Sequence, residues 1–331
     1  MLRNDIEKAL GVLGPLFAET EILEIMVDGA DRVSIERAGG KIEDTDIRFS
    51  SDDEITAILK DTLAVLGTEM EDNKTIYETQ LTDDSRLVAV LPPTSLTGAN
   101  LIIRKWIVDD ILTWEKLLEY RSVSPEMRDL IQRGVDASVN ILVAGGTASG
   151  KTTLANLIVD MVPPEKRVVS VERSHGFHFT HKRAVYLEAG GDSHVSMTDL
   201  LDAASKLRPD ILVVGELHDH FVIPTLQVFA NGHFGLATMH ATSVENALSR
   251  METMCLMNNP GLGLENIRDL IASAFQLLSY QEKLPSNGRK IIQLVELCGI
   301  QDGRYALQPL MRYDPAKDTF ETTGVKPSWE K

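Results

Sequence analysis

The segment Gly145-Gly146-Thr147-Ala148-Ser149-Gly150-Lys151-Thr152 follows an apolar run, Ile141 to Ala144. It fits the P-loop pattern of two glycines separated by four residues and followed by Lys and Thr. A stretch compatible with a helix, Thr153 to Val162, comes next and ends before Pro163-Pro164. This order of strand, loop and helix favours a P-loop over a glycine-rich turn.

A P-loop binds the phosphates of a nucleoside triphosphate. Its glycines let successive backbone N–H groups point at phosphate oxygens. Lys151 is expected to neutralise charge on the β- and γ-phosphates, and the Thr152 hydroxyl to ligate Mg²⁺. The sequence therefore predicts ATP and Mg²⁺ as cofactors. The predicted nucleotide-binding residues are Gly145, Gly146, Thr147, Ala148, Ser149, Gly150, Lys151, Thr152 and Thr153.

Composition limits the class of protein. The 331 residues suffice for two domains. Lys and Arg number 33 against 49 Asp and Glu, and the net charge of −16 disfavours direct binding of nucleic acid or anionic membranes. Cys255 and Cys298 show no metal-like or disulfide-like spacing, which favours a cytoplasmic protein. No run approaches the ~20 apolar residues that span a bilayer, so we expect membrane association only through partners.

Residues 1–108 predict a small α+β domain. Asp28-Gly29 and Gly39-Gly40 are hairpin signals. A capping box, Ser51 to Glu54, predicts the start of a helix. The apolar stretch Ala9 to Ala18 predicts a first core helix rather than a signal peptide. Strand-like runs are Glu21 to Asp28, Arg32 to Glu36, Lys41 to Phe49, Arg86 to Leu91 and Asn100 to Trp106.

Residues 109–124 are more polar and predict a linker, with helix starts at Thr113 and Ser124-Pro125. In residues 125–331, short aliphatic runs alternate with helical stretches, which predicts an α/β domain with a mainly parallel sheet. The expected strands are Asn140 to Ala144, Arg167 to Glu172, Ile211 to Gly215, Gly235 to Met239, Ile291 to Leu297 and Arg304 to Gln308. The last two helices are expected at Ser243 to Met257 and Leu264 to Leu278.

Three side chains at the ends of these strands are candidates for the chemistry. Hydrolysis of a γ-phosphate needs charge neutralisation, a positioned Mg²⁺ and a carboxylate that orients or deprotonates water. Glu216 is the best candidate for that carboxylate, and it is also a candidate Mg²⁺ ligand through water. Glu172 ends another buried strand, and His240 could contact the γ-phosphate. The alternatives are an exposed glutamate after a strand and a structural histidine.

Several blocks of sequence besides the P-loop form a recognisable set. They are Glu24 to Val27, Val90 to Pro93, Ile102 to Trp106, Ser196 to Leu201, Leu207 to Asp210, Val213 to Glu216 and Gly235 to Ala241. Together with the P-loop they resemble the type II/IV secretion traffic ATPases. The segment Leu248 to Met254 resembles the Tad/Flp pilus assembly members, which are CpaF- or TadA-like. The resemblance covers most of the chain and is far more specific than the P-loop alone.

This resemblance implies a RecA-like ATPase domain behind a PAS-like domain. It further implies a homo-hexameric ring that drives pilus or secretion machinery through platform proteins of the inner membrane. In that family a Gly-Glu pair forms an atypical Walker B, a histidine defines the His box, and arginines from the amino-terminal domain reach the phosphates. The positions here that match those of the family are Glu216, His240, Arg104 and Arg86. Together with Lys151 of the P-loop and Glu172 at its strand end, they are the predicted catalytic residues.

The chain also departs from the family pattern. Family members usually have Ile-Glu-Asp-x-x-Glu in the Asp box, whereas Arg173 and Gly176 replace two of the acids here. His218 stands where Gly-Glu-x-Arg-Asp has its arginine. Slow hydrolysis is therefore an open alternative. His175, His178 and His181 lie close in sequence, but on a strand His178 would point away from the other two, which argues against a metal site.

Three functions remain in competition. The leading interpretation is a motor ATPase of a pilus or secretion machine. A nucleotide-binding ring scaffold that hydrolyses poorly is the first alternative, which Arg173 and Gly176 motivate. A nucleic-acid motor is the second, disfavoured by the acidic composition and by the lack of a basic stripe with aromatic residues.

Overall fold

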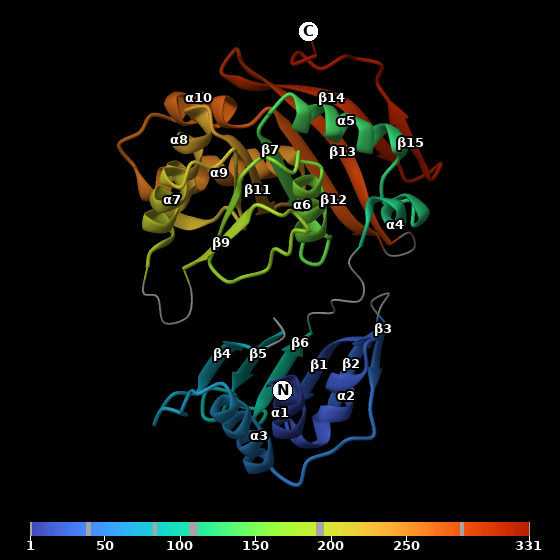
Figure 1. Ribbon diagram of the computed structural model, residues 1–331, viewed down its shortest axis with the longest axis vertical. Helices are drawn as coiled ribbons and strands as arrows, with labels where there is room; N and C mark the ends of the chain where they lie inside the picture. The colour runs from blue at the N-terminus through green and yellow to red at the C-terminus, as the bar shows by residue number, and fades with distance from the viewer. Residues whose placement is uncertain are drawn as a thin grey trace. The chain divides into compact units, whose positions relative to one another are not determined.

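The computed structural model describes residues 2–37, 41–81, 85–105, 112–189, 195–284 and 288–330. The chain divides into two compact units, Met1–Ile111 and Leu112–Lys331, and each unit has its own sheet (Figure 1). The predicted α/β class with a preceding α+β domain is confirmed. Trp106 and the predicted boundary at residues 108 and 109 lie outside the described residues, so the limits 1–108, 109–124 and 125–331 stay a prediction.

In its described residues, the N-terminal unit is an antiparallel sheet with three α-helices. Its six strands have the order β3-β2-β1-β6-β5-β4. Alternate strand residues such as Ile25 and Val27 join a core with Phe17 and Leu59 from the helices. The elements are α1 (Leu2–Ala9), η1 (Gly11–Leu13), α2 (Gly14–Ala18), β1 (Ile22–Asp28), β2 (Val33–Arg37), β3 (Lys41–Asp44), α3 (Asp52–Val65), β4 (Ile76–Gln80), β5 (Arg86–Val90) and β6 (Asn100–Arg104).

Two local expectations for this unit are wrong. The single helix expected over Ala9 to Ala18 is broken, because Gly11 has a φ of +56° that a continuous helix cannot contain. The capping box at Ser51 does not form either, since the Ser51 side chain makes no capping hydrogen bond. Instead the Glu54 carboxylate accepts hydrogen bonds from the Ser50 N–H and hydroxyl, at 2.8 and 2.9 Å.

The second unit contains a mixed sheet of nine strands in the order β15-β14-β13-β12-β7-β11-β10-β8-β9. Neighbours from β12 to β9 are parallel, and β13, β14 and β15 continue the sheet in antiparallel fashion. The strands are β7 (Ile141–Gly145), β8 (Val168–Glu172), β9 (Ala184–Glu188), β10 (Ile211–Val214), β11 (Phe234–His240), β12 (Leu277–Leu284), β13 (Gly288–Gln301), β14 (Arg304–Asp314) and β15 (Thr319–Thr322). The helices are α4 (Trp114–Glu119), α5 (Pro125–Asp136), α6 (Lys151–Asp160), α7 (Met197–Lys206), η4 (Asp219–Phe221), α8 (Val222–Ala230), α9 (Val244–Asn258) and α10 (Leu264–Ala274).

Helices cover both faces of this sheet. Leu142 and Ala144 of β7 join a core with α7 to α10, whereas Ile141 and Val143 join a second core with α4, α5 and α6 (Figure 1). This alternation follows from the two-residue period of a strand. Thr113 and Ser124 cap α4 and α5 as expected, each accepting a hydrogen bond from a backbone N–H. The predicted linker therefore contains a helix that belongs to the second core.

The helix expected over Leu264 to Leu278 is too long. It ends at Ala274, and Leu277 begins β12, which pairs directly with β7 beside the P-loop. The run Leu277 to Gln281 is buried throughout, and an apolar run of that length fits a central strand or a buried helix equally well. Strands β4, β9 and β15 were not specified from the sequence, and β13 and β14 extend beyond the expected limits.

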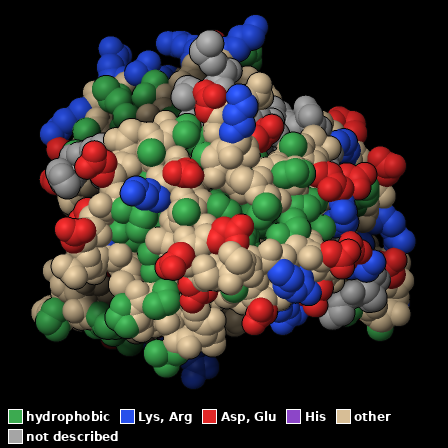
Figure 2. All heavy atoms as spheres, turned by 90° about the horizontal axis from the view of Figure 1, so that it is seen from below, with side chains coloured by type: hydrophobic (Ala, Val, Ile, Leu, Met, Phe, Trp, Pro, Cys, Tyr) green, Lys and Arg blue, Asp and Glu red, His purple; other side chains and the backbone are tan. Residues whose placement is uncertain are grey.

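Within the described residues, no helix combines the length and the apolar character needed to cross a bilayer. The face in Figure 2 carries Asp and Glu side chains interspersed with Lys and Arg. Charges of both signs thus share this face of an acidic chain.

Asn140, just before β7, links four segments of the second unit. Its Nδ2 donates to the carbonyl oxygens of Phe229 and Ala274, at 3.2 and 2.7 Å, and its Oδ1 accepts from the Gly235 N–H at 2.7 Å. The side chain is buried. We expect Asn140→Ala to lower the free energy of unfolding by about 3 kcal/mol, because three buried polar groups lose their partner. Urea denaturation measures this loss. Asn258→Ala, which removes one exposed bond to Met254, is the control and should cost less than about 0.5 kcal/mol.

Candidate nucleotide site

The P-loop leaves the carboxyl end of β7 and turns into α6. Ala148 and Gly150 have φ values of +56° and +96°, so the backbone turns through left-handed conformations immediately before the helix. A side chain at Gly145 would clash with the Ser149 Oγ and would lie 2.5 Å from the Gln281 carbonyl oxygen. Glycine is therefore required at Gly145 by close packing and favoured at Gly150 by conformation.

Three predicted residues converge at the carboxyl ends of β7, β11 and β10. Lys151 Nζ donates to the Gly146 carbonyl oxygen at 2.8 Å and lies 3.2 Å from His240 Nδ1. His240 Nε2 in turn lies 3.5 Å from Glu216 Oε2. Hydrogen bonds from the Leu217 N–H to the Thr238 carbonyl and from the Thr238 hydroxyl to the Gly215 carbonyl hold the two strand ends together.

Burial governs the electrostatics of this cluster. It lowers the pKa of Lys151, and the nearby Glu216 carboxylate opposes this effect. Burial also lowers the pKa of His240, against the opposite pull of Glu216. A neutral His240 with its proton on Nε2 would accept from Lys151 and present an N–H to Glu216. A buried ammonium beside a neutral imidazole is suited to bind an anion.

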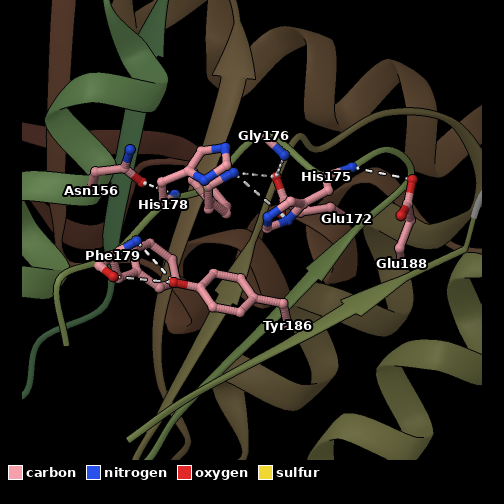
Figure 3. Close-up of polar contacts among 9 residues, drawn as sticks. Asn156, Glu172, His175, Gly176, His178, Phe179, Tyr186 and Glu188 are labelled. Carbon is pink, nitrogen blue, oxygen red and sulfur yellow. Dashed lines mark hydrogen bonds and ion pairs between the residues drawn. The ribbon is translucent and has the colours of Figure 1, made fainter. Parts of the chain in front are cut away.

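Glu172 holds a loop in place rather than pointing freely into the site. The carboxylate is buried and accepts hydrogen bonds from the backbone N–H groups of Gly176 and Phe177, at 3.0 and 3.1 Å. His175 Nδ1 lies 3.3 Å from its other oxygen. Figure 3 shows these groups around one carboxylate. The Glu216 side chain, 40% exposed, is more accessible than Glu172 at 6%.

The loop after Glu172 runs along α6. The Thr180 N–H donates to Asp160 Oδ1 and the His178 N–H to Asn156 Oδ1, at 2.8 and 3.3 Å. These two hydrogen bonds hold the loop against the helix that follows the P-loop.

The strand geometry assumed for the three histidines is wrong. His175 and His178 lie in a loop, and their rings are 4.7 Å apart rather than on opposite faces of a strand (Figure 3). His181 Nε2 is 3.1 Å from the Pro163 carbonyl oxygen. Among the described residues, no group of three or more His, Cys, Asp or Glu could hold a metal ion.

The two residues that depart from the expected pattern in their loops, Arg173 and His218, contact the same carboxylate. Arg173 lies 3.7 Å from the Asp219 carboxylate. His218 has its Nδ1 2.8 Å from that carboxylate. Arg173 and Asp219 are both exposed, so their ion pair contributes at most about 1 kcal/mol.

Glu172→Gln tests the loop-holding role of this carboxylate. An amide keeps one acceptor oxygen but places an NH₂ group against a backbone N–H, so we expect the free energy of unfolding to fall by about 1 to 3 kcal/mol. Urea denaturation gives the value. Glu126→Gln, at an exposed position of α5, is the matched control. If Glu172→Gln is as stable as Glu126→Gln, the Glu172 carboxylate does not hold the loop in place.

Two residues of this site were missed by sequence reasoning. Arg289 Nε donates to the Ala148 carbonyl oxygen at 2.8 Å. Gln281 is 4% exposed and packs against Gly145, and its Nε2 is a buried atom with no hydrogen-bond partner among the described residues. Both come from β12 and β13, more than a hundred residues after the P-loop. Since β12 was misassigned in part to a helix, no local signal pointed to them.

Arg86 and Arg104 belong to the N-terminal unit. They are directly opposite one another in the antiparallel pair β5 and β6, so their side chains share one face of the sheet. Arg86 pairs with Glu78 at 3.3 Å and Arg104 with Glu24 at 3.4 Å. Neighbouring like charges repel, which makes the pair a candidate for binding an anion.

Known proteins share this sequence pattern and this fold. The family model described as "Type II/IV secretion system protein" matches residues 7–300. The probable conjugal transfer protein TrbB of Sinorhizobium fredii is 27% identical, over 93% of each chain. The type IV secretion system protein PtlH of Bordetella pertussis is 32% identical, over 50% of this chain and 52% of its own. The crystal structure of the pilus retraction motor PilT with bound ADP has a TM-score of 0.60 at 18% identity, and covers 93% of this chain and 84% of PilT.

Proposed function

Since the chain belongs to the type II/IV secretion system protein family, we propose that it hydrolyses MgATP as a ring-forming motor. The observation that supports this function best is the contact chain of Lys151, His240 and Glu216 at the ends of three adjacent parallel strands. Such strand ends are where nucleotides bind in α/β sheets. The match to the family model confirms the predicted resemblance to the type II/IV secretion ATPases. The Tad/Flp assignment stays a prediction.

The residues present fit MgATP. The buried Ser149 Oγ has no hydrogen-bond partner among the described residues, and the Lys151 ammonium is buried beside it in the same loop. In our proposal the P-loop N–H groups and Lys151 bind the phosphates, Thr152 ligates Mg²⁺, and Glu216 orients water. Mg²⁺ supplies charge neutralisation at the phosphates. His240 relays the state of the phosphates to Glu216.

A second part of the proposal concerns Arg104 and Arg86, which would contact the phosphates of the bound nucleotide. Arginine's fork matches phosphate oxygens, and such a contact stabilises the reacting state. Arg104→Ala should lower kcat about tenfold or more while it changes nucleotide affinity much less. Phosphate release and a nucleotide titration measure the two effects.

The control for this variant is Arg32→Ala, which removes another exposed arginine paired with a carboxylate of the same unit. Undiminished turnover in Arg104→Ala would mean that its ion pair with Glu24 is only a surface contact.

The alternative of a weakly hydrolysing ring scaffold has its own support. Gly176 supplies no acid, and the two oxygens of Glu172 are engaged by the loop. A phosphate-release assay separates scaffold from motor. A nucleic-acid motor remains the less favoured alternative, which a salt-dependent DNA titration tests.

The proposed assembly is a homo-hexamer in the cytoplasm that meets platform proteins at the inner face of the cell membrane. The membership of a secretion-system family supports this part. Sedimentation with and without a non-hydrolysable ATP analogue should show the ring, and a monomer under all nucleotide conditions would contradict it.

A further inference from the structure

A basic pocket lies at the amino ends of four strands of the nine-stranded sheet, whereas the P-loop follows the carboxyl end of β7. It is lined by segments that enter β8, β9, β10 and β11, and its volume is about 670 Å³. The P-loop, Glu216 and His240 follow the carboxyl ends of β7, β10 and β11, whereas this pocket adjoins the amino ends. A five-residue strand is roughly 16 Å long, so the pocket is separate from the nucleotide site.

The charges of this pocket are unbalanced. Arg167, Arg183, Arg208 and His233 line it, together with one carboxylate, Asp210. The Asp210 oxygens accept from the Arg167 N–H and from Lys166 Nζ, at 2.7 and 3.2 Å. The charge of Asp210 is thus engaged by a backbone group and by a lysine. Three guanidinium groups line one pocket of a chain whose net charge is −16. One of them, that of Arg183, also donates to the Glu165 carbonyl oxygen.

Two further observations indicate that the pocket is built for a ligand. Arg167 Nε is a buried donor with no hydrogen-bond partner among the described residues. Buried donors normally have partners, so the Arg167 side chain carries one donor that the described residues leave unpaired. Arg208 has a φ of +54°, which is uncommon for a residue with a side chain. Such strained residues cluster at ligand-binding sites, where the strain positions a functional group.

We propose that this pocket binds a ligand through one or more phosphate groups. Planar guanidinium groups match the geometry of phosphate oxygens. Three of these positive charges line the pocket, and one carboxylate, Asp210, can neutralise only one of them. The volume lies in the range of about 300 to 1,000 Å³ that is typical of small-molecule sites. Leu207 adds exposed apolar surface at the rim for the rest of the ligand. The phosphate belongs to a soluble molecule or to a lipid headgroup.

The experiment measures binding of two phosphate probes while a non-hydrolysable ATP analogue saturates the P-loop. The first probe is inorganic pyrophosphate at fixed free Mg²⁺, titrated calorimetrically. The second is sedimentation with phosphatidylcholine vesicles that contain or lack phosphatidic acid. Arg208→Gln and Arg167→Gln remove charge from the pocket. Arg304→Gln, at an exposed arginine of the same unit, is the matched control. Circular dichroism verifies that each variant folds.

Saturable pyrophosphate binding that weakens about tenfold or more in both pocket variants, but not in Arg304→Gln, supports a site for a soluble phosphate ligand. The same pattern with phosphatidic acid vesicles alone supports a lipid headgroup. Binding of neither probe, or equal binding by all variants, overturns the proposal. This test does not depend on ATP turnover, so it stands or falls independently of the proposed function.

Discussion

Lys151→Ala is expected to lower the kcat for ATP hydrolysis by about 100-fold or more, because a preorganised positive charge at the reacting phosphates is lost. The Lys151 ammonium is buried and fixed by the Gly146 carbonyl oxygen and by His240. Its burial lowers the pKa of Lys151, and a bound triphosphate would favour the charged form again. The substitution therefore removes an ammonium group whose charged form bound nucleotide would favour.

The matched control is Lys326→Ala, which removes an exposed lysine of the same unit. Phosphate release and titration with a labelled ATP analogue report turnover and affinity separately. If Lys151→Ala keeps both affinity and turnover, the P-loop assignment fails.

Glu216→Gln is expected to retain MgATP binding and to lower kcat by about 10²- to 10³-fold. An amide is nearly isosteric with the carboxylate, but it is neither a base nor an anion. Glu216 is the more accessible of the two candidate carboxylates, and its Oε2 lies 3.5 Å from His240. We infer that it carries most of the organisation of water and Mg²⁺, since Gly176 supplies no acid at the Asp box.

Glu172→Gln is the comparison for this experiment, measured at a temperature where both variants are folded. Loss of kcat in Glu216→Gln with smaller loss in Glu172→Gln supports the assigned roles. If Glu216→Gln retains full kcat while Glu172→Gln loses it, the roles are reversed.

The sequence predicted the part of the fold that surrounds the P-loop. Strands β7, β8, β10 and β11 lie within a residue or two of their expected limits, because each is a short buried aliphatic run next to a clear turn or helix signal. Strand β12 was missed because tertiary pairing with β7 decided between helix and strand. At Gly11, a single residue with positive φ interrupts the helix that the apolar stretch Ala9 to Ala18 predicted.

The site was partly predictable for the same reason. Lys151, Glu216 and His240 follow recognisable strands or lie within a motif, and the parallel sheet brings them together. Gln281 and Arg289 reach the P-loop only through the pairing of β12 with β7 and β13, which no local pattern encodes. The contact between His175 and His178 depends on an irregular loop held by Glu172 and Asn156. A strand prediction for these residues places His175 and His178 on opposite faces, so it could not predict the contact between their rings.

The most direct test of the proposed motor function is release of inorganic phosphate from MgATP by the wild-type chain. Lys151→Ala serves as the background in the same assay. We expect steady turnover by the wild type well above that background. Stoichiometric binding of ATP without phosphate release above the Lys151→Ala background would contradict the motor function and leave the nucleotide-binding scaffold.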